Sequence, residues 1–377
     1  MRLHFAVTLI TFLVLFIKQT PGKYQEYTYV DPTKLICIYI AHSIRPRTFI
    51  GSTTTLENVT IHTPSQRVTA STEFNLTFNL PGLQDGELQL NLEPNHDILG
   101  QSLHTRHINV NGEIRRTETV GRAGHKVFKG RAFIRYPGRG WEKAGWARIY
   151  MVQDRLKPLF EGSFSVFSQR YHVKIASHEG ASRMVVEHDF VSDIQSGNLL
   201  PRQTRGNGNM PIFRRQVSGP DNEDLISSIG NTDGCPTTRR VAVLGIATDC
   251  EYTASFDSPD DIRQNLISML NTASEVFEST FNIALAIHNL TITDAACPDN
   301  ATDPVPWNVA CSAGIMEWRH QQFTNWRGSL SDTTNAYWTL MSGCPTGQQV
   351  GISWNGALCD SERSTNVVAQ NDWQVFA

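Results

Sequence analysis

The second part of the sequence has no lysine, and this absence reveals how the chain is organised. Residues 216–377 hold 6 basic and 19 acidic residues, whereas residues 1–215 hold 27 basic and 17 acidic residues. The total charge of −3 therefore hides a basic part followed by an acidic part. Because the basic residues are scattered, the pattern disfavours a nucleic-acid-binding arm and favours a cleavable basic segment docked on an acidic domain.

Several motifs that would announce a common chemistry are also missing. The sequence has no Gly-x-Ser-x-Gly nucleophile elbow, no phosphate-binding loop and no dinucleotide fingerprint. It has no Cys-x-x-Cys, so a structural zinc ribbon is disfavoured as well. These absences exclude the hydrolase, nucleotide-binding and dinucleotide-binding classes that depend on such motifs.

No apolar run is long enough to cross a membrane. The apolar run near the N-terminus, Phe5 to Ile17, has thirteen residues without a charge, whereas a membrane-spanning helix needs about 20. Its length and its place behind Arg2 are typical of a signal peptide, which predicts a signal over residues 1–20 and entry into the secretory pathway. A buried element near the terminus is the alternative. Residues 21–57, with a shorter apolar patch at Leu35 to Ala41, remain unassigned.

Cysteine is scarce in the first part of the chain and concentrated in the second. Only Cys37 precedes residue 235, and an even number of cysteines falls in the last part: Cys235, Cys250, Cys297, Cys311, Cys344 and Cys359. This pattern predicts a disulfide framework formed in an oxidising compartment. Proximity in sequence predicts the pairs 235–250, 297–311 and 344–359. Four Asn-x-Ser/Thr sequons, at Asn58, Asn75, Asn289 and Asn300, predict N-glycosylation.

Residues 58–200 have the pattern of a β-rich domain. Phe74, Leu76, Phe78 and Leu80 alternate with polar neighbours, and later apolar runs are separated by Gly, Pro and charged clusters. This alternation predicts a half-buried antiparallel sheet, arranged as a sandwich or barrel.

Residues 201–235 read as a linker because they are rich in Gly, Asn, Pro, Asp and Ser. The dibasic pair Arg214-Arg215 lies inside this segment, at the point where the charge of the chain changes sign. We expect processing proteases of the secretory pathway to cut there.

Residues 236–377 change to an α/β pattern. The apolar run from Arg240 to Ile246 predicts a buried strand, and Ser258-Pro259 followed by two acids predicts a helix start. Further strands are expected over 283–292, 336–341 and 350–354, with a second helix over 313–326. Strands alternating with helices predict an α/β domain with a mixed sheet.

The histidines of the chain form no metal-binding constellation. His178-Glu179 begins like a zinc-protease motif, but Ser182 stands where the second histidine is needed. His104 and His107 have no third partner in a stretch that reads as a loop. His288 is expected in a strand as a satisfied histidine, and His320 in a helix with a packing or surface role. The sequence therefore offers no catalytic residue and no metal ligand of its own.

A resemblance to a known family lies near the end of the chain. Gln349-Val350-Gly351-Ile352-Ser353-Trp354-Asn355-Gly356-Ala357-Leu358-Cys359 is similar to the edge-strand segment of the ADAM/reprolysin zinc metalloproteinases, with the fungal type as the best match. Asp332-Thr333 and Leu340-Met341-Ser342-Gly343 resemble the segment before it. Asn366 to Ala369 and Asp372 to Ala377 resemble the start of the active-site helix, which in the family continues into His-Glu-x-x-His-x-x-Gly-x-x-His.

The resemblance implies a multidomain zymogen: a β-rich pro-domain, then an incomplete metzincin-type catalytic domain over 236–377. It implies zinc as cofactor and hydrolysis of peptide bonds in protein substrates. The main chain of Val350, Gly351, Ile352 and Ser353 would bind an extended substrate peptide. The family's zinc ligands and catalytic glutamate have no counterpart here, so this chain alone is expected to be inactive, with any membrane anchor in a missing C-terminal part.

Two other functions stay open. The chain could be a non-catalytic secreted glycoprotein, either a pseudoprotease or a pro-domain that binds a full-length protease. A β-rich carbohydrate- or cell-surface-binding protein is the third class, and it rests on the sheet pattern with Trp141 and Trp146. Stoichiometric zinc with peptidase activity would exclude the non-catalytic alternative.

Overall fold

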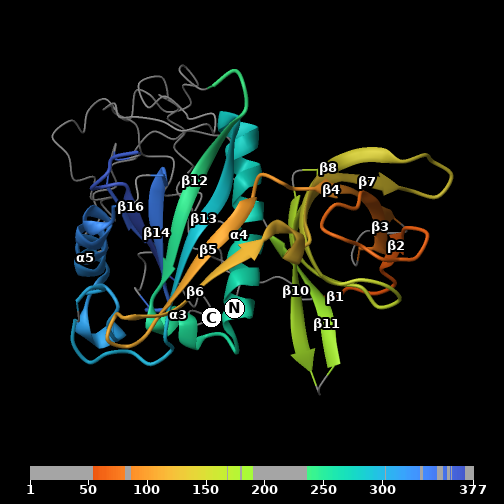
Figure 1. Cartoon of the computed structure of the whole chain (residues 1–377). Helices are drawn as coiled ribbons and strands as arrows, with labels where there is room; N and C mark the ends of the chain where they lie inside the picture. The colour runs from red at the N-terminus through yellow and green to blue at the C-terminus, as the bar shows by residue number, and fades with distance from the viewer. Residues whose placement is uncertain are drawn as a thin grey trace, which may run out of the picture.

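The computed structural model describes residues 54–80, 86–167, 169–178, 181–189, 236–301, 303–331, 334–345, 351–354, 357 and 359–369. The expected signal peptide, the Leu35 to Ala41 patch with Cys37, and the linker with Arg214 and Arg215 lie outside these residues. Two sheets make up the described part, and a long helix, α4, stands between them (Figure 1). None of the described helices is long and apolar enough to cross a membrane.

The first sheet, called the antiparallel sheet, has nine strands in the order β1-β11-β10-β9-β8-β7-β4-β3-β2. Its strands are β1 (Thr54–Thr55), β2 (Thr60–His62), β3 (Phe74–Asn79), β4 (Glu87–Pro94), β7 (Val127–Arg135), β8 (Glu142–Gln153), β9 (Leu159–Val166), β10 (Gln169–His178) and β11 (Ala181–Asp189).

The antiparallel sheet curls around its own apolar core. Phe78 of β3 lies with its ring centroid 5.6 Å from that of Phe164 on β9, although three strands separate β3 from β9 in the sheet order. A flat sheet would hold them about 19 Å apart at about 4.8 Å per strand. The expectation of a sandwich-like or barrel-like antiparallel fold therefore matches the geometry.

The second sheet, called the mixed sheet, has seven strands in the order β15-β16-β14-β12-β13-β5-β6. Its strands are β15 (Gly351–Ser353), β16 (Thr365–Ala369), β14 (Tyr337–Ser342), β12 (Arg240–Thr248), β13 (Ile283–Thr293), β5 (Leu99–Ile108) and β6 (Ile114–Gly121). The pairs at the two edges, β15 with β16 and β5 with β6, are antiparallel, and the inner pairs are parallel.

The β5–β6 hairpin departs from the sequence-based expectation. It comes from the region predicted as a self-contained antiparallel sheet, yet β5 pairs in parallel with β13. The backbone N–H of Ile287 donates to the carbonyl of Ile98 at 2.8 Å, and the N–H of Asp294 donates to Ile108 at 2.9 Å. Leu99 and Leu103 enter the core that α4 forms with β12 and β13. Sequence alternation alone does not reveal this because it specifies a face and not a partner.

Helices cover both faces of the mixed sheet. The short α3 (Cys250–Ala254) follows β12, and α4 (Pro259–Phe281) packs on one face, as the helix-start signals predict. The side chain of Ser258 caps α4, and Asn282 ends it in the left-handed conformation at φ 57°. On the other face α5 (Met316–Ser329) begins a few residues later than expected, after a 3-10 turn over Cys311–Ala313. A second such turn, Arg122–Gly124, links β6 to β7.

The predicted disulfide pairs are wrong. The bonds join Cys250 to Cys297 and Cys311 to Cys344. The thiol of Cys359 is free and half-buried, and desolvation raises its pKa to about 11. The reason is topological, because β12, β13 and β14 are parallel and end at the same edge of the sheet. Cysteines that follow different strands therefore meet there, while neighbours in sequence are separated by whole elements. Cys235 lies outside the described residues.

A buried ion pair holds the same edge together. Asp249, fully buried at the end of β12, accepts hydrogen bonds from the N–H groups of Tyr252 (2.8 Å) and Gly343 (3.0 Å). Its second oxygen accepts from the Ser342 hydroxyl and lies 3.5 Å from Nη1 of Arg319. Burial raises the pKa of Asp249, and Arg319 opposes that rise. Asp249 thus links β12, α3, α5 and the end of β14.

We expect Asp249→Asn to lower the free energy of unfolding by about 3 kcal/mol, since it leaves the buried guanidinium of Arg319 uncompensated. Asp360→Asn is the control, because Asp360 pairs with the mostly exposed Arg363 at 2.9 Å. That change should cost about 1 kcal/mol or less. Urea unfolding of the two variants and the parent chain gives the comparison, and equal losses would contradict a special role for Asp249.

Candidate functional site

The segment that carries the family resemblance forms the edge of the mixed sheet. β15 ends the strand order, so one of its edges has no strand partner in the described part of the chain. Its three residues are half-buried and pair with β16 in the register Gly351 to Val368, Ile352 to Val367 and Ser353 to Asn366. An extended peptide could add to such an edge by main-chain hydrogen bonds. Val350, the fourth residue expected here, lies outside the described residues.

The stretch expected to begin the active-site helix is a strand. Residues 365–369 form β16, which is fully buried and pairs in parallel with β14. The prediction that Asn366 to Ala369 start a helix is therefore wrong. A short apolar run such as Val367-Val368-Ala369 fits a buried strand as well as a helix, and its β-branched residues favour the strand. Residues 372–377 lie outside the described residues.

A set of four side chains, called the brace, connects β15 and β16 to α5. His320 of α5 hydrogen-bonds through Nε2 with the carbonyl of Thr365 at 3.0 Å. The hydroxyl of Thr324, one turn later, lies 2.7 Å from that of Thr365 and accepts from Nε1 of Trp354 at 2.8 Å. The ring of His320 packs 5.0 Å from the indole of Trp354. The brace thereby fixes the residue after β15 against the helix behind it.

Burial determines the charge of the brace. The side chain of His320 is only 2% exposed, and desolvation lowers its pKa to about 4, although the Thr365 carbonyl favours the protonated form. The imidazole is therefore neutral at physiological pH. The packing role considered for His320 is confirmed, and the surface role is wrong. Sequence reasoning missed the brace because no spacing rule connects Thr324 to Thr365 or Trp354.

The remaining histidines do not converge on a metal site. His104 and His107 lie in β5 and not in a loop, and they point to opposite faces because they are three positions apart along the strand. The ring of His104 lies 5.1 Å from that of His288 on β13, and His107 contacts Glu118 at 3.0 Å. Within the described residues no three His, Cys, Asp or Glu side chains are grouped to hold a metal ion. We therefore assign no described residue to zinc.

The predicted glycosylation sites differ in exposure. Asn58, Asn75 and Asn300 are exposed, whereas Asn289 is half-buried in β13 between β12 and β5.

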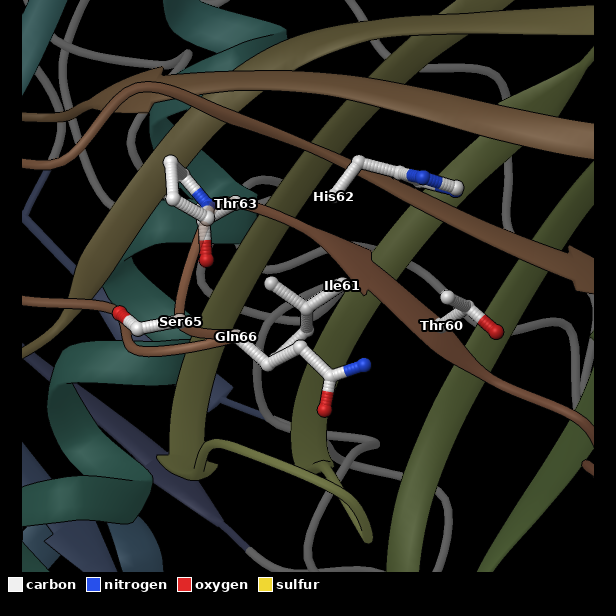
Figure 2. A pocket seen from close by; sticks show the side chains of 7 residues that line it. Thr60, Ile61, His62, Thr63, Ser65 and Gln66 are labelled. Carbon is white, nitrogen blue, oxygen red and sulfur yellow. The ribbon is translucent and has the colours of Figure 1, made fainter.

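Two hollows lie on or beside the antiparallel sheet. One, of about 590 Å³, is formed by residues 60–66 alone, and Figure 2 shows Thr60, Ile61 and His62 along β2 with the turn that follows. The other, of about 1060 Å³ and called the cleft, lies between the antiparallel sheet and the C-terminal half of α4. The residues that line the first hollow include no Asp, Glu, Lys or Arg, whereas the cleft is lined by charged side chains of both signs.

Acidification should destabilise the fold through His320. Its pKa of about 4 in the folded state lies below the ordinary 6.5, so the unfolded chain binds the proton first as pH falls. The contribution of the neutral His320 to the free energy of unfolding is therefore complete above pH 6.5. It is lost between pH 6.5 and 4, and the loss is about 3 kcal/mol. We expect His320→Gln to reduce that slope in urea unfolding between pH 7.5 and 4.5.

His62→Gln is the control for this measurement, because His62 is exposed on β2. Part of the slope should survive in His320→Gln, since burial also lowers the pKa of His125 to about 4. An unchanged slope in His320→Gln would refute the assignment.

Comparison with known proteins places these features in a family. Residues 237–377 match the model of a reprolysin-type family described as metallo-peptidase family M12. The chain is 37% identical over 393 residues to the disintegrin and metalloproteinase domain-containing protein B of Aspergillus fumigatus, covering 85% of this chain and 50% of that protein. It is 34% identical to the proteins of the same name from Arthroderma otae and Arthroderma benhamiae, with 85% of this chain covered in both and 50% and 49% of those proteins.

The chain spans about half the length of the curated relatives that it matches. The match to M12 begins just before β12 and includes all strands of the mixed sheet except the β5–β6 hairpin. The relatives extend the similarity over most of the chain, so the family resemblance of the edge-strand segment is confirmed. Residues 237–377 therefore form a reprolysin-type part of metallo-peptidase family M12, in a chain that is related over most of its length to the fungal disintegrin and metalloproteinase domain-containing B proteins.

Proposed function

We propose that this chain is the pro-segment and the first part of the catalytic domain of a secreted, zinc-dependent endopeptidase that hydrolyses peptide bonds in proteins. The observation that carries the proposal is the M12 match over residues 237–377. It coincides with a mixed sheet in which the outer edge of β15 pairs with no strand of the described residues. Zinc would supply an activated water at neutral pH. The relatives are about twice as long as the part of them that this chain matches, and the metal site is proposed to lie in the part that the chain does not span.

The proposed role of β15 is to hold the substrate. A peptide in extended conformation would pair antiparallel or parallel with the outer edge of Gly351, Ile352 and Ser353. Gly351 has no side chain, so the backbone of the substrate can approach it closely. The brace supports this role because it ties Trp354, the next residue, to α5 through Thr324.

The proposed role of residues 58–200 is that of a pro-segment docked on the catalytic part, with a signal peptide over 1–20 and processing at Arg214-Arg215 in the linker. Strand pairing between β5 and β13 supports this role. The tip of the hairpin reaches further, since a Cβ added to Gly112 at φ 80° would lie 2.6 Å from Pro304. The disulfides Cys250–Cys297 and Cys311–Cys344 suit the oxidising secretory pathway.

Charge complementarity supports the docking. Arg148 of β8, with its side chain 4% exposed, contacts Glu275 of α4 at 2.5 Å and Glu278 at 3.3 Å. Asp97 forms an ion pair with Arg239 and a second one with Lys129 at 3.2 Å. Burial alone would raise the pKa of Asp97, but these two cations hold it below its usual value. The contacts therefore run in both directions and do not simply follow the net charges of the two parts.

The test of the proposed function uses a longer form that carries these 377 residues followed by the family's zinc-binding segment. We expect stoichiometric zinc and hydrolysis of an unfolded protein substrate after processing, and loss of both on treatment with a chelator. Zinc-loaded protein that fails to cleave any unfolded substrate would refute the proposal. It would favour the second candidate, a non-catalytic secreted glycoprotein that binds other proteins.

Within that longer form, Gly351→Ala should raise KM about tenfold with little change in kcat. The added methyl group obstructs one main-chain hydrogen bond to the substrate, worth about 1.4 kcal/mol. Gly328→Ala on α5 is the matched control, because a Cβ there meets no atom within 4 Å. Equal KM values for the two variants would remove β15 from the substrate site.

The docking is tested separately with the processed chain. Arg148→Met leaves Glu275 without its cation, while Glu278 keeps its ion pair with Arg239 at 2.9 Å. The variant should weaken the complex by about 3 kcal/mol. We expect the two fragments to elute together from a sizing column for the parent and apart for this variant. Arg135→Met is the control, since Arg135 is half-exposed and pairs with Glu87 inside the antiparallel sheet. Co-elution of the Arg148 variant at low micromolar concentration would contradict the ion-pair contribution.

A further inference from the structure

The cleft has a floor made by the outer face of the antiparallel sheet and a wall made by α4. Its floor comes from β3, β4, β7 and β8, and its wall includes Glu275 and Glu278. It is open, holds about 1060 Å³, and takes no part in the proposed substrate edge at β15.

Strand register places four side chains in one row across the floor. Asn75 of β3 pairs with Asn91 of β4, Asn91 pairs with Arg131 of β7, and Arg131 pairs with Trp146 of β8. Directly paired residues present their side chains on the same face of a sheet. All four line the cleft. The row runs from Asn75 to Trp146 over three strand spacings, about 14 Å.

The chemistry of the row suits a carbohydrate. Asn91 and Arg131 can bond sugar hydroxyl and acetamide groups, and the half-buried indole of Trp146 offers a flat apolar surface for a pyranose ring. The carboxylates of Glu73 and Glu93 also line the cleft and can accept hydrogen bonds from sugar hydroxyl groups.

A buried donor in the cleft supports the presence of a ligand. Nη1 of Arg148 has no acceptor among the described residues, although its side chain is only 4% exposed and the residue lines the cleft. Arg148 follows Trp146 by two positions on β8, so the two side chains share a face. Buried donors are nearly always paired in folded proteins, which makes an oxygen-rich occupant the natural partner.

A ligand for the cleft could be attached covalently at one end of the row. Asn75-Leu76-Thr77 is a sequon, and Asn75 is exposed at the start of the row. We propose that an N-linked glycan on Asn75 lies in the cleft along the row Asn91, Arg131 and Trp146, and clasps the antiparallel sheet to α4. This inference rests on the secretory route of the proposed function and does not depend on proteolytic activity.

The other sequons offer internal comparisons. Asn58 and Asn300 are exposed outside the cleft, so glycans there would extend into solvent. The glycan on Asn75 would instead begin beside His62, which hydrogen-bonds the sequon hydroxyl of Thr77 at 2.8 Å. Protection of one glycan and not the others is therefore the signature of the clasp.

The experiment expresses the full 377-residue chain in a secreting eukaryotic host and digests the native protein with a peptide N-glycosidase. Site-by-site mass spectrometry follows the release of each glycan. We expect release at Asn75 to be about tenfold slower than at Asn58, which corresponds to about 1.4 kcal/mol of contact. Trp146→Ala should bring the two rates together, whereas Trp141→Ala should not, because Trp141 lies outside the cleft beneath the guanidinium of Arg135.

Arg131→Ser is the second variant, since Arg131 is exposed and its loss leaves the core intact. It should speed release at Asn75 without changing release at Asn58. Equal rates at Asn75 and Asn58 in the parent, or a bare Asn75 beside glycosylated Asn58 and Asn300, would overturn the clasp alone. A secreted chain that carries no glycan at any sequon would also overturn it, whereas zinc and peptidase measurements leave it unaffected.

Discussion

The parallel pairing of β5 with β13 is the interaction on which the rest of the structure depends. It joins the first part of the chain to the second by main-chain hydrogen bonds, and it carries Leu99 and Leu103 into the core under α4. The same register brings Arg115 of β6 within 3.1 Å of Asp294, which follows β13. A one-residue slip would turn the apolar face of β5 away from α4, so the pairing is specified by burial.

The helix α4 is shaped by having a sheet on each side. Its apolar positions, such as Leu266 and Leu270, follow the stripe that the sequence predicts, yet polar residues on other faces are buried too. Asn271 shows why, since its amide contacts Asn95 and the carbonyl of Phe128 across the seam. These hydrogen bonds replace water for groups that would otherwise be costly to bury.

Local signals in the sequence predicted much of the fold, while non-local pairing stayed beyond its reach. The Ser258 cap, the α4 stripe and the strands β12, β13, β14 and β15 are decided within a few residues, and they were predicted correctly. The destination of β5 is decided by an edge nearly 200 residues away. The disulfide partners failed for the same reason, because parallel strands bring distant cysteines to one edge.

The candidate site shows the same division. The edge strand β15 could be located because eleven consecutive residues resemble a family segment. Residues 366–369 were misjudged because a short apolar run does not distinguish a strand from a helix. The neutral, buried state of His320 could not be foreseen, since it results from contacts with Thr365 and Trp354, whose approach only the folded chain reveals.

The composition of β13 has a consequence for solubility. Its eleven residues include no Asp, Glu, Lys or Arg, and no proline interrupts them. Such a strand, if it were an exposed edge strand, would be prone to pair with the same strand of another molecule. The neighbour that shields it is itself bordered by β6, where Arg115, Arg116 and Glu118 place charges along the outermost strand. With the β5–β6 hairpin in place, the edge strand on this side of the mixed sheet is the charged β6 and not the uncharged β13. A molecule without the hairpin would expose β13 as an edge strand and would be prone to aggregation.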